Sequence, residues 1–204
     1  MIRVVDYGVG NIQAFLTIYK RLGILADRAS TQMDLLDATH LILPGVGAFD
    51  HAMHLLNQSG LRPTLEELVL GKKIPLLGVC VGMQMLGASS EEGVLPGLNW
   101  VPGQVRSFAN TPQSSLLPMP HMGWNDLEFQ NKAVLFKNFD PNPRFYFLHS
   151  FYFSCVDPKH VAARARYGLD FDCVVSNENI HGVQCHPEKS HHHGVQLLKN
   201  FAEI

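Results

Sequence analysis

The feature that most constrains the fold is a nearly unbroken apolar run, residues 74–79 (IPLLGV), which leads into the segment GVCVG (78–82). An apolar run without polar alternation favours a strand that is buried on both faces, as in a parallel sheet covered by helices. The two glycines permit a sharp turn from strand to helix, where side chains would collide with neighbouring backbone. The segment therefore predicts that Cys80 lies in a nucleophile elbow; a buried cysteine at the end of a strand is the alternative.

Strand-like and helix-like patterns alternate in the first half of the chain. Strands are predicted at residues 2–5 and 41–43, and a helix is predicted to follow the elbow from Val81. Between the first two strands, apolar side chains recur with helical spacing at Ile12, Phe15, Leu16, Tyr19 and Leu22. This order of strand, helix and strand is typical of a parallel α/β sheet.

The second half of the chain predicts shorter strands and a closing helix. Strands are expected at residues 144–150 and at an antiparallel pair, 173–176 and 180–184. A helix is expected over residues 194–201, with Val195 and Leu198 on its apolar face, and residues 110–120 predict a loop. We therefore expect one α/β domain over residues 1–204, with an open, mostly parallel twisted sheet, helices on both faces and an antiparallel extension.

Composition argues against several classes of protein. The 16 basic and 18 acidic residues form no long runs, so the chain carries no electrostatic footprint for nucleic acid. The amino terminus turns polar at Asp6 before a signal-like apolar region develops, and no segment predicts a membrane span. The four cysteines lack CxxC spacing, which favours free thiols. We expect a cytoplasmic protein that acts on a small neutral or zwitterionic substrate.

A candidate base and its orienting carboxylate follow the strand at 180–184. Pro187 favours an extended backbone at His186, and side chains at i and i+2 of an extended chain project to the same side. His186 and Glu188 can therefore meet, with one imidazole nitrogen left to face Cys80. A surface histidine and glutamate around a strand-ending proline is the alternative, which the elbow at Cys80 makes less favourable.

A third motif, PGVGAF (44–49), follows the apolar residues 41–43 directly. Its two glycines let the backbone turn tightly and expose N–H groups that can receive the negative oxygen of a tetrahedral intermediate. A second donor is expected at the N–H of Val81, immediately after the cysteine. An ordinary connection between strand and helix is the alternative for this motif.

Taken together, these motifs resemble a known family. Gln84 stands four residues after Cys80, and PGVGAF, GVCVG and HPEKS (186–190) occur in the order found in class I (triad) glutamine amidotransferases. Within that class, four segments resemble the glutaminase subunit of imidazole glycerol phosphate synthase: DYGVGNI (6–12), PHMGWN (120–125), FLHS (147–150) and GVQCHPEKS (182–190). The match runs along nearly the whole chain, and the anthranilate-type and GMP-type relatives lack PHMGWN.

The resemblance implies a glutaminase with a class I amidotransferase fold and L-glutamine as its substrate. Cys80 would attack the side-chain amide, His186 would protonate the departing ammonia, and Glu188 would complete the triad. Backbone N–H groups of Val46 and Val81 would stabilise the oxyanion. The residues implied to hold glutamine are Gly47, Gln84, His149, Ser150 and Phe151.

The resemblance also implies a heterodimer. The resembled glutaminase delivers ammonia to a (β/α)8-barrel cyclase, which forms imidazole glycerol phosphate in histidine biosynthesis. Asn11, Trp124 and Lys189 match positions that face this cyclase. A helix cap, a core aromatic and a solvated cation are their respective alternative interpretations.

Two further functions stay open. Very similar pairs of proteins supply ammonia for amidine formation on an acetamido sugar in surface-polysaccharide pathways, and residues 91–100 (EEGVLPGLNW) and 8–15 (GVGNIQAF) have features of that branch. The non-enzymatic alternative is a decayed amidotransferase that only binds a partner. The presence of Cys80, His186 and Glu188 argues against a binding module.

We expect neither a metal nor an organic cofactor. The one histidine-rich segment, residues 191–193, offers three adjacent side chains, and adjacent side chains cannot easily converge on one ion. A polar start to the last helix is the better interpretation.

Overall fold

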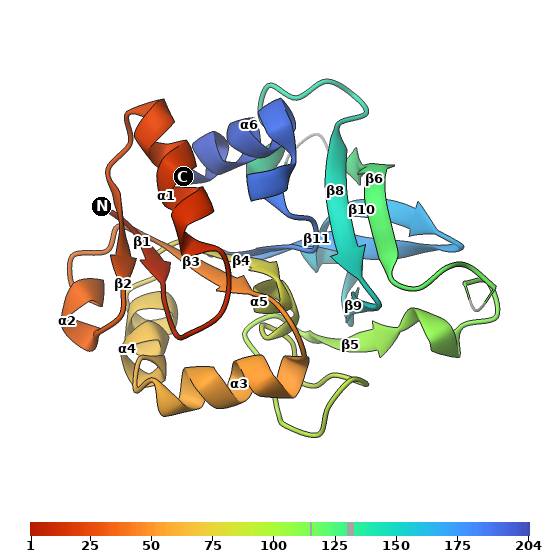
Figure 1. Cartoon of the computed structure of the whole chain (residues 1–204), viewed down its shortest axis with the longest axis horizontal. Helices are drawn as coiled ribbons and strands as arrows, with labels where there is room; N and C mark the ends of the chain where they lie inside the picture. Colours follow the sequence, from red (N-terminus) through yellow and green to blue (C-terminus); the bar gives the residue numbers. More distant parts are fainter. Residues whose placement is uncertain (115, 130–132) are drawn as a thin grey trace.

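The structure is a computed structural model that describes residues 1–114, 116–129 and 133–204. Its main sheet has ten strands, with the order β2-β1-β3-β4-β12-β11-β10-β7 and two further strands, β9 on β11 and β5 on β9 (Figure 1). These strands are β1 (Ile2–Val5), β2 (Ala26–Ala29), β3 (His40–Gly45), β4 (Leu76–Cys80), β5 (Gly103–Ser107), β7 (Glu128–Phe129), β9 (Phe151–Cys155), β10 (Val161–Tyr167), β11 (Leu169–Asn177) and β12 (Ile180–Val183). A separate two-stranded sheet pairs β6 (His121–Asp126) with β8 (Arg144–His149).

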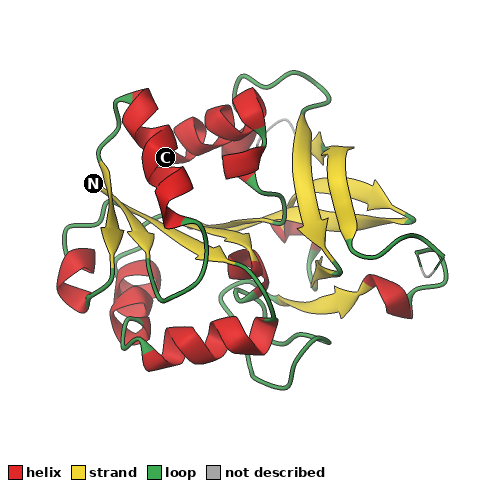
Figure 2. Cartoon of the chain, in the orientation of Figure 1, coloured by secondary structure: helices red, strands yellow, loops and turns green. Residues whose placement is uncertain are grey.

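Helices cover both faces of the main sheet, as Figure 2 shows. The helices α1 (Ile12–Leu22) and α6 (His191–Ala202) lie on one face, and the phenol of Tyr19 joins them by donating to the carbonyl of Leu198 at 3.1 Å. The other face carries α2 (Gln32–Leu35), α3 (Phe49–Gln58) and α4 (Arg62–Glu66). Shorter helical segments are α5 (Val81–Gln84), η1 (Glu67–Gly71), η2 (Phe108–Asn110), η3 (Val134–Phe136), η4 (Pro158–His160) and η5 (Pro187–Lys189).

The parallel part of the sheet brings the predicted motifs to one edge. The strands β2, β1, β3, β4 and β12 are mutually parallel, and β12 then pairs antiparallel with β11. In the register, Gly45 of β3 lies beside Cys80, and Val183 of β12 lies beside Val79. Because the carboxyl ends of parallel strands meet at one edge, the segments after β3, β4 and β12 are adjacent in space.

Most predicted elements are confirmed. The helix at α1 buries Ile12, Phe15 and Tyr19, as the apolar spacing predicts, and β11 and β12 form the expected antiparallel pair. The loop expected at 110–120 contains no helix or strand over residues 111–114 and 116–120, while residue 115 lies outside the described residues. No helix within the described ranges is long and apolar enough to cross a membrane.

Several boundaries differ from the prediction, and the strand expected at 173–176 begins at Leu169 and ends at Asn177. The strand expected from residue 74 begins at Leu76, and the closing helix begins at His191 rather than 194. Its buried face contains Leu197, Leu198 and Phe201, whereas Val195 is only half-buried. The apolar spacing located this helix, but its three polar histidines concealed the first turn.

Candidate active site

Cys80 occupies the sharp turn between β4 and α5. Its backbone has φ 55° and ψ −113°, a conformation that side-chain-bearing residues rarely adopt and that the surrounding structure must enforce. Glycine is required two residues later, because a Cβ on Gly82 would overlap the carbonyl oxygen of Leu43 in β3. The turn leaves Cys80 4% exposed at the wall of a cavity. The elbow predicted from the sequence is confirmed as a backbone conformation.

His186 and Glu188 meet beside Cys80, as predicted. His186 Nδ1 lies 2.8 Å from Glu188 Oε1, and both side chains are almost fully buried. His186 has extended backbone (φ −101°, ψ 92°), but Glu188 lies in the short helical turn η5, so their contact spans a turn rather than a continuous strand. Ser190 fixes this turn: its hydroxyl donates to the carbonyl of His186 at 2.6 Å and accepts from the N–H of Tyr146 at 3.0 Å. The motif HPEKS did not predict this anchoring role.

The electrostatics of His186 are unusual. Burial disfavours its charged form, but hydrogen bonds to Cys80 and Glu188 outweigh burial and raise the pKa of His186 to about 10. Since Glu188 takes Nδ1, the ring presents Nε2 to Cys80. The imidazole therefore holds a proton at neutral pH, between the sulfur of Cys80 and the carboxylate of Glu188.

The cavity beside Cys80 has a volume of about 300 Å³. All predicted oxyanion and substrate-binding residues line it: Val46, Gly47, Val81, Gln84, His149, Ser150 and Phe151. Gly47 has φ 84°, so the turn after β3 uses the left-handed conformation that glycine tolerates. The structure thus brings together the ends of β3, β4 and β8 and the start of β9 around one sulfur atom.

Sequence inspection missed four residues of this site. Glu92, Pro120 and Leu148 also line the cavity, and Glu92 accepts a hydrogen bond from the N–H of Phe49 at 2.9 Å, in place of a side-chain cap for α3. Gln184 is fully buried behind Cys80, with its Nε2 at 3.8 Å from Sγ. Its place in GVQCHPEKS, two residues before His186, was the only signal that could have found it.

The three predicted interface residues lie in different settings. Asn11 caps α1, because its side chain accepts from the N–H of Ala14 at 3.2 Å. Trp124 on β6 is 41% exposed and stacks on His191 with ring centroids 5.1 Å apart, so it is not a core aromatic. Lys189 lines the cavity, with its Nζ 5.8 Å from the centroid of the Tyr146 ring.

The other cysteines have environments that suppress the thiolate. Burial raises the pKa of Cys155 to about 12, with a further contribution from nearby Asp172. Burial also raises the pKa of Cys173 and Cys185 well above the ordinary thiol value. Since the thiolate is the reactive form, these three thiols should be poor nucleophiles.

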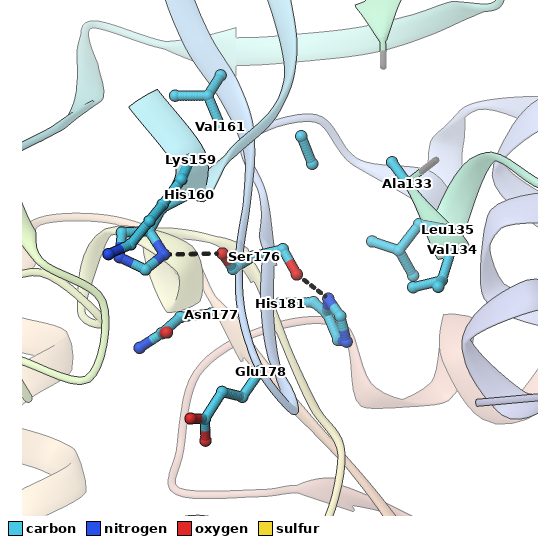
Figure 3. Close-up of a pocket in the computed structure, with 11 residues that line it drawn as sticks. Ala133, Val134, Leu135, Lys159, His160, Val161, Ser176, Asn177, Glu178 and His181 are labelled. Atoms are coloured by element: carbon cyan, nitrogen blue, oxygen red, sulfur yellow. Dashed lines mark hydrogen bonds between the residues drawn. The ribbon is translucent and has the colours of Figure 1, made fainter. Parts of the chain in front are cut away.

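A second cavity, of about 370 Å³, lies on another part of the surface (Figure 3). Ser176 is at its centre, with its carbonyl 3.2 Å from His160 Nδ1 and its hydroxyl 2.9 Å from His181 Nδ1. The described residues that line this cavity include no cysteine. Across the described ranges, no three or more His, Cys, Asp and Glu side chains are grouped to hold a metal ion.

Comparison with known proteins gives a consistent family assignment. The family model described as "Glutamine amidotransferase class-I" matches residues 4–204. The chain is 59% identical to "Imidazole glycerol phosphate synthase subunit HisH" of Bdellovibrio bacteriovorus and 49% identical to the protein of that name from Leptospira borgpetersenii, in both cases over all of each chain.

Solved structures support the same fold at lower identity. A glutamine amidotransferase crystal structure has a TM-score of 0.75 and 21% identity, covering 99% of this chain and 97% of the other. A glutamine amidotransferase from Thermotoga maritima has a TM-score of 0.63 and 16% identity, covering 99% of this chain and 82% of that chain.

Proposed function

Because the chain belongs to the class I glutamine amidotransferases, we propose that it is the glutaminase subunit of an imidazole glycerol phosphate synthase, releasing ammonia from glutamine at Cys80. The observation that carries the proposal is the assembly of Cys80 and His186 at one wall of a cavity of about 300 Å³, with Glu188 bonded to the other nitrogen of His186. A cavity of this size suits a small substrate. The full-length relatives named as such subunits support the choice of synthase.

The first half-reaction forms a thioester. Cys80 Sγ attacks the carbon of the glutamine side-chain amide as a thiolate, because its proton is already on His186, and the carbonyl oxygen takes up the negative charge of the tetrahedral intermediate. Backbone N–H groups of Val46 and Val81 stabilise that oxygen. As the C–N bond breaks, His186 gives its proton to the nitrogen, and ammonia leaves.

The second half-reaction releases glutamate. His186, now neutral, takes a proton from a water molecule while the water oxygen attacks the thioester carbon. The C–S bond breaks, and Cys80 returns to its starting state with His186 again protonated. Glu188 holds Nδ1 throughout and stabilises the imidazolium that forms in each cycle.

The cavity lining suits a zwitterionic amino acid. The carboxylate of Glu92 offers a counter-charge to the α-ammonium of glutamine, and Lys189 at the same cavity offers one to the α-carboxylate. Backbone groups around His149, Ser150 and Phe151 provide further polar contacts. These residues, with Gln84 and Gly47, form the proposed substrate site.

The surface beside the cavity suits a protein partner. Met122, Trp124 and Leu148 are 64%, 41% and 36% exposed, on the two-stranded sheet formed by β6 and β8. Exposed apolar side chains gathered in this way are typical of an interaction surface. We propose that a (β/α)8-barrel cyclase covers this sheet, with Lys189, Trp124 and Asn11 at the interface, and receives the ammonia.

Irreversible labelling tests the site directly. A diazoketone analogue of glutamine should modify Cys80 and leave Cys155, Cys173 and Cys185 largely unmodified, because burial raises the pKa of those three thiols. Peptide mapping of the labelled protein measures the distribution, and glutamine should protect Cys80. Equal modification of all four thiols would contradict a substrate-directed nucleophile at Cys80.

A further inference from the structure

A chain of hydrogen bonds leads from β6 into the active site. His121 and His149 lie opposite each other in the pairing of β6 with β8, and both are buried. His121 Nδ1 is 2.9 Å from His149 Nε2, and His149 Nδ1 is 2.7 Å from the carbonyl oxygen of Phe151. The ring of His121 is stacked between Phe147 and Tyr167, with centroids 5.0 and 4.2 Å away, so its plane is fixed.

The two ends of this chain determine where its protons lie. At the outer end, Asn125 Oδ1 accepts from the N–H of Asp126 at 2.9 Å, and Asn125 Nδ2 donates to the carbonyl of Arg166 at 2.9 Å. The amide therefore faces His121 with its NH₂ group, at 3.2 Å from Nε2, and Nε2 must accept. His121 then carries its proton on Nδ1 and donates it to His149 Nε2.

The inner end requires the same direction. A carbonyl oxygen can only accept, so His149 Nδ1 must donate to Phe151. His149 Nε2 is then free to accept from His121, and both rings are neutral. Burial supports this state, because it lowers the pKa of His121 to about 4 and, with a smaller effect of His121 itself, that of His149 to about 3.

The chain of hydrogen bonds continues through the side chains of Gln84 and Gln184 to the sulfur of Cys80. Gln84 Nε2 donates to the carbonyl of Phe151 and to Gln184 Oε1, both at 3.1 Å. Because Gln184 Oε1 accepts this bond, its Nε2 is turned toward Cys80 Sγ at 3.8 Å. A flip of either amide would set two NH₂ groups or two oxygens against each other.

We propose that His121 and His149 are positioning residues for glutamine hydrolysis, because this neutral pair fixes the amides of Gln84 and Gln184 through the Phe151 carbonyl. In this orientation Gln84, which lines the cavity, uses its NH₂ group within the protein and leaves its oxygen for the substrate, and Gln184 points an N–H at the sulfur of Cys80. The inference rests on the proposed glutaminase function. The segment PHMGWN carries His121 and Asn125. The inference gives these two residues a role inside the protein rather than at the partner surface.

Two pairs of variants separate positioning from packing. His121→Phe keeps a ring between Phe147 and Tyr167 but removes both nitrogens, whereas His121→Asn places an amide N–H near the position of Nδ1. His149→Phe and His149→Asn make the same comparison for the bond to Phe151. His160→Phe is the matched control, since buried His160 also bonds a backbone carbonyl through Nδ1, but in the second cavity.

The measurement is glutamate formation by the full chain in complex with its cyclase partner, over a range of glutamine concentrations. We expect each Phe variant to lower kcat/KM on the order of 10- to 100-fold, mainly through a higher KM for glutamine, while ammonium-dependent synthesis is unchanged. Each Asn variant should recover most of the loss, and His160→Phe should match the wild type. Thermal unfolding identifies any variant that does not fold. If a variant at one histidine does not fold, the pair of variants at the other histidine tests the inference.

Two results would overturn the inference. Wild-type KM values in the Phe variants would show that these hydrogen bonds do not position the substrate site. Equal losses in the Phe and Asn variants would show that shape, not the donated hydrogen bond, matters. Absence of glutamine hydrolysis in the wild-type complex would instead contradict the proposed function, so the two failures are distinguishable.

Discussion

Replacing Cys80 with alanine is expected to lower glutamine-dependent turnover on the order of 10⁴-fold or more, since the change removes the atom that forms the thioester. The same variant, assembled with its partner, should still make product from an ammonium salt, because the partner's chemistry does not use the thiol. The fold should persist, since alanine fits where the cysteine side chain lies. The measurement is product formation with each nitrogen source at matched protein concentration.

A matched control comes from Cys173 on β11, which is fully buried. Cys173→Ala should retain glutamine-dependent activity close to the wild type. Glutamate release by Cys80→Ala within tenfold of the wild type would refute the role of Cys80. Loss of both glutamine- and ammonium-dependent synthesis would indicate failed assembly with the partner, which gel filtration of the mixture checks separately.

Glu188→Gln is expected to reduce kcat by about 10³- to 10⁴-fold, the range seen when an amide replaces the carboxylate of a catalytic triad. The amide N–H would donate to His186 Nδ1 and force the ring proton onto Nε2. The neutral ring could then no longer accept a proton there. The variant also loses the buried carboxylate that helps to raise the pKa of His186 to about 10.

Stability should change with pH in a defined direction. A histidine whose pKa is raised on folding stabilises the protein fully below its unfolded pKa, about 6.5, and this contribution is lost as pH rises through about 10. The difference in Tm between wild type and Glu188→Gln should therefore shrink as the pH rises between these values.

Glu178→Gln, at an exposed ion pair with Lys73, serves as the control for Glu188→Gln and should retain full activity. A kcat within tenfold of the wild type for Glu188→Gln would contradict the triad.

The parts of the site that follow from local sequence were predictable. The elbow at Cys80 depends on glycines within two residues, and the contact of His186 with Glu188 depends on residues within one turn. The parallel sheet was predictable from its apolar runs. Strands that are buried on both faces have nearly continuous apolar sequences, whereas strands with one solvent-exposed face alternate apolar and polar residues. These features need no information about distant contacts.

The parts that depend on distant contacts were not predictable. The hydrogen bonds from Asn125 through His121 to His149 require β6 to pair with β8, although β7 and η3 lie between them in the sequence, and no periodicity specifies that register. Glu92 enters the site from an irregular segment that packs on the start of α3. Asn11 illustrates a different limit: its helix-capping role is in the structure, but capping alone says nothing about a partner.

The most direct test of the central claim follows nitrogen from glutamine to product. The purified chain is mixed with the cyclase subunit of its own cell, the cyclase substrate, and glutamine labelled with a heavy isotope of nitrogen in the side-chain amide. Unlabelled ammonium is added as a competitor. We predict imidazole glycerol phosphate that carries the labelled nitrogen despite the competitor, because ammonia released at Cys80 passes directly to the partner. Product that forms only from the ammonium salt, or label that appears only with a sugar-modifying partner, would contradict the account.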